Sequence, residues 1–103
     1  GAVPVIPLKD TVRSRQGDFG GEVLDRSSLC LVQTPQSFEL TLCKRAYALL
    51  FAREEDRCNI TDDAMVVERF TGQNIRLVQG DPKNIKVTAP EDLEIAQLWL
   101  EKV

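Results

Sequence analysis

Histidine is absent from this chain of 103 residues, which removes the commonest general base, any Ser/His/Asp or Cys/His triad and the usual transition-metal ligand. Cysteine is scarce. Cys30, Cys43 and Cys58 are an odd number without Cys-x-x-Cys spacing, so neither a disulfide framework nor a zinc knuckle fits. Any chemistry must therefore use lysine, arginine, carboxylates and hydroxyls.

Long apolar runs are also missing. The longest, at residues 47–52, is far shorter than a membrane span, and no charged-then-apolar leader opens the chain. The net charge is −3, with both signs interspersed and no basic stripe, which argues against nucleic acid or a membrane surface as a partner. We expect a soluble protein of the cytoplasm, made of one small domain or a piece of one.

The first third of the chain predicts an apolar strand at residues 2–7, followed by a hairpin arm. Residues 10–14 and 22–26 form the limbs of this arm, and the glycine-containing stretch 15–21 forms its turn. The limbs carry few apolar side chains, and an isolated two-stranded hairpin is marginally stable. We therefore expect the arm to pack against a partner.

The remaining elements alternate between strands and helices, which indicates an α/β fold. A helix of about four turns should follow the cap Ser37, with its apolar positions at three-to-four spacing, and stop in the charged run 53–57. Thr61 or Asp62 can cap a second helix, and Thr88 to Glu91 form a capping box for the last one. Short strands are expected at 29–33, 75–78 and 85–87.

Two short polar segments, residues 60–64 and residues 84–93, lie at expected helix starts and strand ends. These are the places where α/β domains hold phosphorylated ligands. In the first, Thr61 is either a plain helix cap or a ligand-binding hydroxyl. In the second, Lys86 lies within an apolar segment and either snorkels outward or meets an anion. Asp62 and Asp63 are adjacent on a helix and do not converge on one metal ion. The two segments favour a sugar-phosphate site.

Several motifs, read in order, resemble the second half of the 2-C-methyl-D-erythritol 4-phosphate cytidylyltransferases. They are Pro7-Leu8-Lys9-Asp10-Thr11-Val12, Asp25-Arg26, Gln33-Thr34-Pro35-Gln36, Ile60-Thr61-Asp62-Asp63-Ala64, Gly80-Asp81 and Asn84-Ile85-Lys86-Val87-Thr88 with Pro90-Glu91-Asp92-Leu93. The resemblance implies the C-terminal portion of a Rossmann-like nucleotidyltransferase domain with a protruding β-hairpin arm. Residues 1–103 would be a single partial domain, with the arm at 10–26 and an acceptor-binding α/β portion at 27–103.

The resemblance also implies a reaction, transfer of CMP from CTP to methylerythritol phosphate in non-mevalonate isoprenoid biosynthesis. Lys86 and Arg26 would position the acceptor phosphate for attack, while Thr11, Thr34 and Thr61 would bind the substrate. Thr11 and Arg26 would reach from the arm into the neighbouring site of a homodimer. Magnesium would come with CTP through the N-terminal half, so no metal ligand is expected in this chain.

The glycine-rich loop that would wrap the triphosphate has no counterpart in this sequence. We therefore expect a fragment that is inactive without its first half, which could be a separate chain. Two alternatives stay open: a fragment of a ribitol-5-phosphate cytidylyltransferase, and a noncatalytic binding or dimerisation module on the same scaffold.

Overall fold

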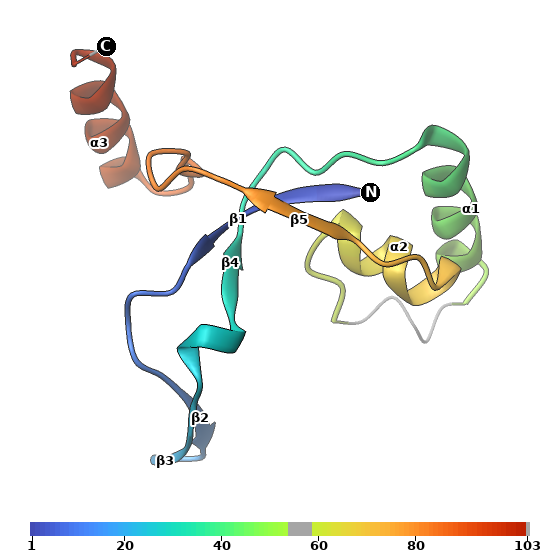
Figure 1. Ribbon diagram of the computed structural model, residues 1–103, viewed down its shortest axis with the longest axis horizontal. Helices are drawn as coiled ribbons and strands as arrows, with labels where there is room; N and C mark the ends of the chain where they lie inside the picture. The colour runs from blue at the N-terminus through green and yellow to red at the C-terminus, as the bar shows by residue number, and fades with distance from the viewer. Residues whose placement is uncertain (54–58, 103) are drawn as a thin grey trace. The chain divides into compact units, whose positions relative to one another are not determined.

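The computed structural model describes residues 1–53 and 59–102 and shows an α/β fold (Figure 1). A three-stranded sheet has the order β4-β1-β5, and β2 and β3 form a separate two-stranded sheet. The chain divides into two compact units, one of Gly1–Pro4 with Thr34–Val78 and the other of Val5–Gln33 with Gln79–Val103. The elements are β1 (Ala2–Pro7), β2 (Val12–Gln16), β3 (Phe19–Leu24), the 3-10 turn η1 (Arg26–Ser28), β4 (Cys30–Val32), α1 (Leu40–Phe51), α2 (Asp63–Thr71), β5 (Arg76–Gln79) and α3 (Pro90–Leu100).

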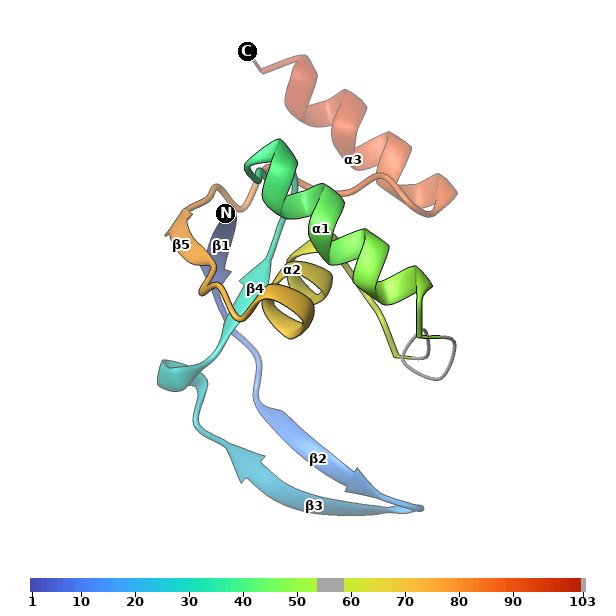
Figure 2. The same cartoon turned by 90° about the vertical axis from the view of Figure 1, so that its right-hand side faces the viewer.

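The first unit is built on the pair of helices α1 and α2, which lie side by side in both ribbon views (Figures 1 and 2). Their core consists of Ala46, Leu50, Val66 and Val67, all buried. α2 starts at the cap Asp62 and ends at Gly72, whose φ of 71° is the left-handed conformation that glycine adopts freely. The helical spacing of apolar residues predicted both helices correctly.

The predicted start of α1 is wrong. The helix begins at Leu40 after Glu39, without a side-chain cap bond. Ser37 is held instead by two backbone hydrogen bonds with Ala2, of 2.8 and 3.0 Å. Its carbonyl oxygen and N–H group are thus engaged in an extended bridge, so Ser37 does not open the helix. At the other end α1 stops at Phe51, and the predicted stop in the charged run reaches residues 54–58, outside the described residues.

The second unit contains the antiparallel pair β1 and β4, with Ile6 opposite Leu31. It also contains the arm, whose strands β2 and β3 run side by side (Figure 2). Gln16 pairs with Phe19, so the turn is two residues long rather than the predicted seven. Gly17, with φ of 59°, permits this tight turn. The hairpin itself is confirmed.

The predicted strand at 85–87 is wrong, because these residues form no ladder. The backbone before them is engaged in turn and side-chain hydrogen bonds instead. The capping box of α3 is also shifted by one residue. Asp92, not Glu91, accepts hydrogen bonds from the N–H groups of Ala89 and Thr88, at 2.9 and 3.0 Å. The first helical residue is Pro90, a position that needs no N–H donor.

Candidate functional site

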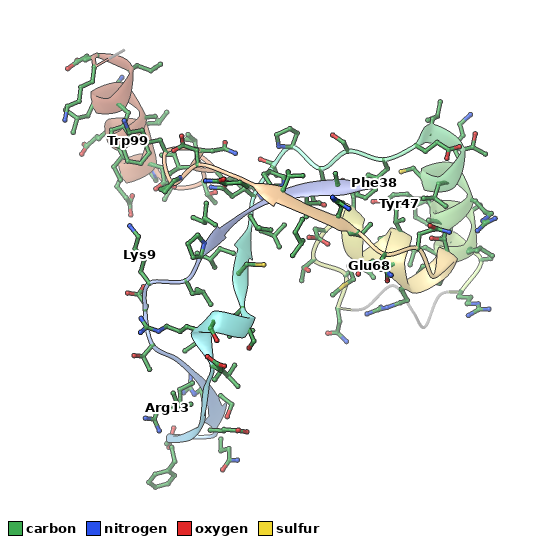
Figure 3. All side chains as sticks on the ribbon, in the orientation of Figure 1. Lys9, Arg13, Phe38, Tyr47, Glu68 and Trp99 are labelled. Carbon is green, nitrogen blue, oxygen red and sulfur yellow. The ribbon has the colours of Figure 1, made fainter. Side chains whose placement is uncertain are left out.

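At the base of the arm, Arg26 lies in η1 and its guanidinium donates a hydrogen bond to the carbonyl oxygen of Lys9. Figure 3 labels Lys9. The turn is capped by Asp25, whose carboxylate accepts from the hydroxyl and the N–H of Ser27, at 2.7 and 3.0 Å. These two bonds, the hydroxyl one first, lower the pKa of Asp25. Thr11 follows Lys9 by two residues and is exposed. The fold thus brings Arg26 and the segment that carries Thr11 together.

Lys86 lies in the irregular segment before α3, and it is exposed. Its carbonyl oxygen accepts a hydrogen bond from the hydroxyl of Thr88, at 3.2 Å. Hydrogen bonds from the backbone at the start of α3 lower the pKa of Asp92, the carboxylate that caps this helix. The lysine therefore stands immediately before a helix start, with its ammonium group accessible to an anion.

In the other unit, Thr34 and Thr61 belong to segments that Gln36 ties together. The Gln36 carboxamide donates to Asp62 Oδ2 at 3.0 Å and accepts from the N–H of Ala64 at 3.1 Å. Asp62 Oδ1 accepts from the N–H of Met65 at 2.9 Å, as an N-cap should. Thr61, next to this cap, and Thr34, before Pro35, are both exposed.

Tyr47 on α1 donates a hydrogen bond to Asp63 in the first turn of α2. This bond, with partial burial and the negative charge of the carboxylate adding to it, raises the pKa of Tyr47 to about 12. The pair joins the two helices outside their apolar core. It also gives Asp63 a structural role, as the acceptor of a hydrogen bond between the two helices.

The structure thus places Thr11, Arg26 and Lys86 in one unit and Thr34 and Thr61 in the other. Sequence reasoning missed two residues that organise these segments, Gln33 and Gln36. The Gln33 carboxamide donates to the carbonyl oxygens of Asp81 and Asn84. Gln33 and Gln36 lie in one four-residue motif after β4. The presence of two glutamines in this motif was the sequence signal that could have pointed to them.

Within residues 1–53 and 59–102, no group of three or more acidic, cysteine or histidine side chains could hold a metal ion. Cys30 and Cys43 are free thiols, and Cys58 lies outside the described residues. None of the described helices has the length and apolar character needed to cross a membrane.

A hollow of about 370 Å³ lies between the segment at 83–87 and α3. Trp99, which Figure 3 labels on α3, lines it together with Ile85 and Ala96, and Lys83 and Lys102 contribute cationic groups. Trp99 is partly buried and lines this hollow. Among the described residues, none of α3 is buried, so Trp99 is not a core residue here, and its interpretation as an interface aromatic stays a prediction.

An α/β fold with exposed arginine, lysine and hydroxyl groups at helix starts and turns is consistent with a nucleotidyltransferase, which binds phosphate groups. The sequence profile of one such family, described as 2-C-methyl-D-erythritol 4-phosphate cytidylyltransferase, matches residues 1–102, and the chain belongs to this family. The predicted family is confirmed.

Named relatives agree with this assignment. The chain is 46% identical over 100 residues to the enzyme of that name from Rubrobacter xylanophilus, with 97% of this chain and 42% of the relative covered. It is 43% identical over 99 residues to the enzyme from Geobacillus kaustophilus, with 96% and 42% covered.

Solved structures agree as well. The cytidylyltransferase from Thermus thermophilus superimposes with a TM-score of 0.77 at 38% identity, covering 99% of this chain and 48% of that one. The 4-diphosphocytidyl-2C-methyl-D-erythritol synthase from Anaerococcus prevotii gives 0.83 at 29% identity, covering 97% and 44%. The predicted similarity of fold is confirmed.

The chain spans about 42% of the length of the curated relatives it matches. The prediction that it is the C-terminal portion, or second half, of such an enzyme is not confirmed by these alignments and is withdrawn.

Proposed function

We propose that this chain is the acceptor-binding part of an enzyme that transfers CMP from CTP to 2-C-methyl-D-erythritol 4-phosphate, a step of non-mevalonate isoprenoid biosynthesis. A phosphate oxygen of the acceptor attacks the α-phosphorus of CTP, and the bond to the β-phosphate breaks. The products are a cytidine diphosphate alcohol and pyrophosphate. The observation that carries this proposal is the match of the family over residues 1–102.

Lys86 and Arg26 are the proposed catalytic residues. A phosphate monoester is already largely ionised near neutral pH, so its attack needs no general base, and the absence of histidine is no obstacle. The reaction needs instead positioning and neutralisation of charge. The exposed Lys86 supplies a point charge for the acceptor phosphate, and the planar guanidinium of Arg26 can bind two phosphate oxygens at once.

Thr11, Thr34 and Thr61 are the proposed substrate-binding hydroxyls. Each is exposed, and a hydroxyl both donates and accepts hydrogen bonds, as a polyol phosphate requires. Thr61 directly precedes Asp62, the residue whose carboxylate caps the start of α2. The Gln36 carboxamide holds this helix start against the segment that follows Thr34. We assign Thr61 to the polyol portion of the substrate and Thr11 to its phosphate.

Binding of CTP and its magnesium ion is assigned to the remainder of the full-length enzyme. The described residues contain no group of side chains suited to a metal ion, and no step is assigned to magnesium here. We propose further that the arm pairs with a second copy of the enzyme, which would bring Arg26 and Thr11 to the neighbouring site. Phe19 at the tip of the arm is 80% exposed, which suits such an interface. A cytoplasmic location stays a prediction.

The test is pyrophosphate release from CTP with magnesium, with methylerythritol phosphate and ribitol phosphate offered in parallel to the full-length enzyme. The proposal expects release with methylerythritol phosphate only. Release with ribitol phosphate alone would assign the chain to the other cytidylyltransferase. No pyrophosphate release with either acceptor, from folded protein, would indicate a scaffold that keeps the fold without the catalytic activity. The isolated chain and its mixture with the remaining part of the enzyme test whether this part is inactive alone.

A further inference from the structure

Gln33, directly after β4, holds a turn that lies far away in the sequence. Its Nε2 donates to the carbonyl oxygens of Asp81 and Asn84, at 2.8 and 3.1 Å. Its Oε1 accepts from the N–H of Asp81 at 3.3 Å. One side chain thus makes three hydrogen bonds to the backbone of a single turn, across sequence separations of 48 and 51 residues.

The turn is also closed by bonds of its own. The N–H of Asn84 donates to the carbonyl oxygen of Asp81 at 2.9 Å, and the N–H of Lys83 donates to Asp81 Oδ1 at 2.8 Å. These local bonds set the shape of the turn. They do not set its place on the sheet, because both partners move together. The N–H of Gly80 ties the start of the turn to the carbonyl oxygen of Val5 in β1, at 2.8 Å. The Gln33 carboxamide links the turn itself to the end of β4.

The sequence makes room for this link at Gly80. A methyl group at this position would collide with Gln33 Oε1 and would come within 3.1 Å of the carbonyl oxygen of Val5. The backbone of Gly80 does not have the left-handed φ found at Gly17 and Gly72. A side chain at position 80 would therefore displace the Gln33 carboxamide from its present place, although the backbone conformation itself does not demand glycine.

On its other side, the segment is fixed by the start of α3. The N–H of Thr88 donates to Asp92 at 3.0 Å, and the Thr88 hydroxyl donates to the Lys86 carbonyl oxygen at 3.2 Å. Only three residues separate Asn84, which Gln33 holds, from Thr88. Lys86 is the middle one. A lysine side chain is flexible but of fixed length, so the position of the Lys86 backbone limits the region in which its ammonium group can bind an anion.

We propose that Gln33 is a positioning residue for Lys86, and this inference rests on the proposed function. Through its carboxamide, Gln33 places the turn at 81–84 and thereby the backbone of Lys86, which holds the acceptor phosphate. Without the carboxamide, the turn keeps its local bonds but loses its attachment to β4. The lysine then meets the phosphate less often in the reactive geometry.

The test is a double-mutant cycle in the full-length enzyme with Gln33→Met, Lys86→Ala and the two combined, read as kcat/KM for methylerythritol phosphate. Methionine keeps the length of the side chain and removes its hydrogen bonds. We expect Gln33→Met to lower kcat/KM roughly tenfold, since small misplacements of reacting groups are that costly. Lys86→Ala should lower it roughly tenfold or more, as loss of a charged contact does. In the Lys86→Ala background, Gln33→Met should change little, because its effect acts through the lysine.

Gln36→Met is the matched control, because Gln36 has the same side chain but contacts the start of α2 instead. Its effect should add to that of Lys86→Ala. An equal loss from Gln33→Met in both backgrounds would overturn the inference, and so would no loss in either. Gly80→Ala is a second route to the same displacement and should reproduce the pattern if Gln33→Met does not fold.

Hydrogen exchange of the amides at 81–88 separates this inference from the proposed function. Gln33→Met should speed their exchange relative to wild type, while exchange in α2 stays unchanged. Unchanged exchange at 81–88 would overturn the positioning role even in an active enzyme. Absence of cytidylyltransferase activity in the wild type would overturn the proposed function, and with it the role of Gln33 in catalysis, while faster exchange would still show the link to β4.

Discussion

Replacing Asp62 by alanine removes a carboxylate that serves two partners at the start of α2. Oδ1 accepts from the N–H of Met65 at 2.9 Å, and Oδ2 accepts from Gln36 at 3.0 Å. Loss of an N-cap costs about 1 kcal/mol. A hydrogen bond to a charged group contributes about 1.5 kcal/mol at the low end of its range, which suits a half-buried site. Asp62→Ala should therefore lower the free energy of unfolding by about 2.5 kcal/mol.

The assay is urea unfolding followed by far-ultraviolet circular dichroism, which reports on the helices. In thermal unfolding followed by the same signal, a loss of this size should lower Tm by roughly 10 °C for a cooperative unit of about 100 residues. Gln36→Ala and the double variant complete a cycle, and the coupling between the two residues should be about 1 kcal/mol. Glu68→Ala, an exposed acidic residue of the same helix (Figure 3), should change stability by less than about 0.5 kcal/mol. A loss from Asp62→Ala no larger than that of Glu68→Ala would refute the reasoning.

Three further predictions concern single side chains. Arg26→Ala should raise the KM for methylerythritol phosphate roughly tenfold, as loss of a charged contact does, and leave CTP binding intact; unchanged kinetics would remove the arm from the site. Tyr47 should ionise with a pKa of about 12, above its ordinary 10.0. Its bond to Asp63 therefore stabilises the fold below pH 10 and is lost as the pH rises through about 12. In Asp63→Asn, the midpoint of the tyrosine titration, followed by ultraviolet absorbance, should move toward pH 10. The pKa of Asp92 is lowered from its ordinary 3.8. The stabilisation of α3 by this cap is therefore complete above pH 3.8 and is lost as the pH falls through the lowered pKa. Circular dichroism of the wild type should show a loss of helicity at acid pH that is absent in Asp92→Asn.

Helical elements were predictable from the sequence because their signals are local. Apolar spacing gave α1 and α2, and the acids near Pro90 marked the start of α3. The errors arose where a distant partner decides. Ser37 has the chemistry of a cap, but its backbone pairs with Ala2 at the beginning of the chain. Residues 85–87 have the composition of a strand, but they form no ladder.

The residues of the candidate site show the same difference between local signals and distant partners. The exposed hydroxyls and charges at Thr61, Lys86 and Arg26 were singled out from their residue types and from motif resemblance. The two glutamines that hold these segments were quoted only as part of a motif, since a glutamine in a sequence does not reveal where its carboxamide binds. Gln33 bonds to residues 48 and 51 positions away, and Gln36 to residues 26 and 28 positions away. Periodicity and capping rules do not reach across such separations.

The helix α3 shows why an apolar pattern and a buried core are different findings. Its apolar spacing was read correctly as one helical face, yet Leu93 and Leu98 are more than half exposed and Ile95 is 41% exposed. No residue of α3 is buried against the described part of the chain. A helix of 11 residues is marginal in water on propensity alone, so the hydrogen bonds of the cap at Asp92 are important for its stability. Its apolar face therefore has no partner that buries it among residues 1–53 and 59–102.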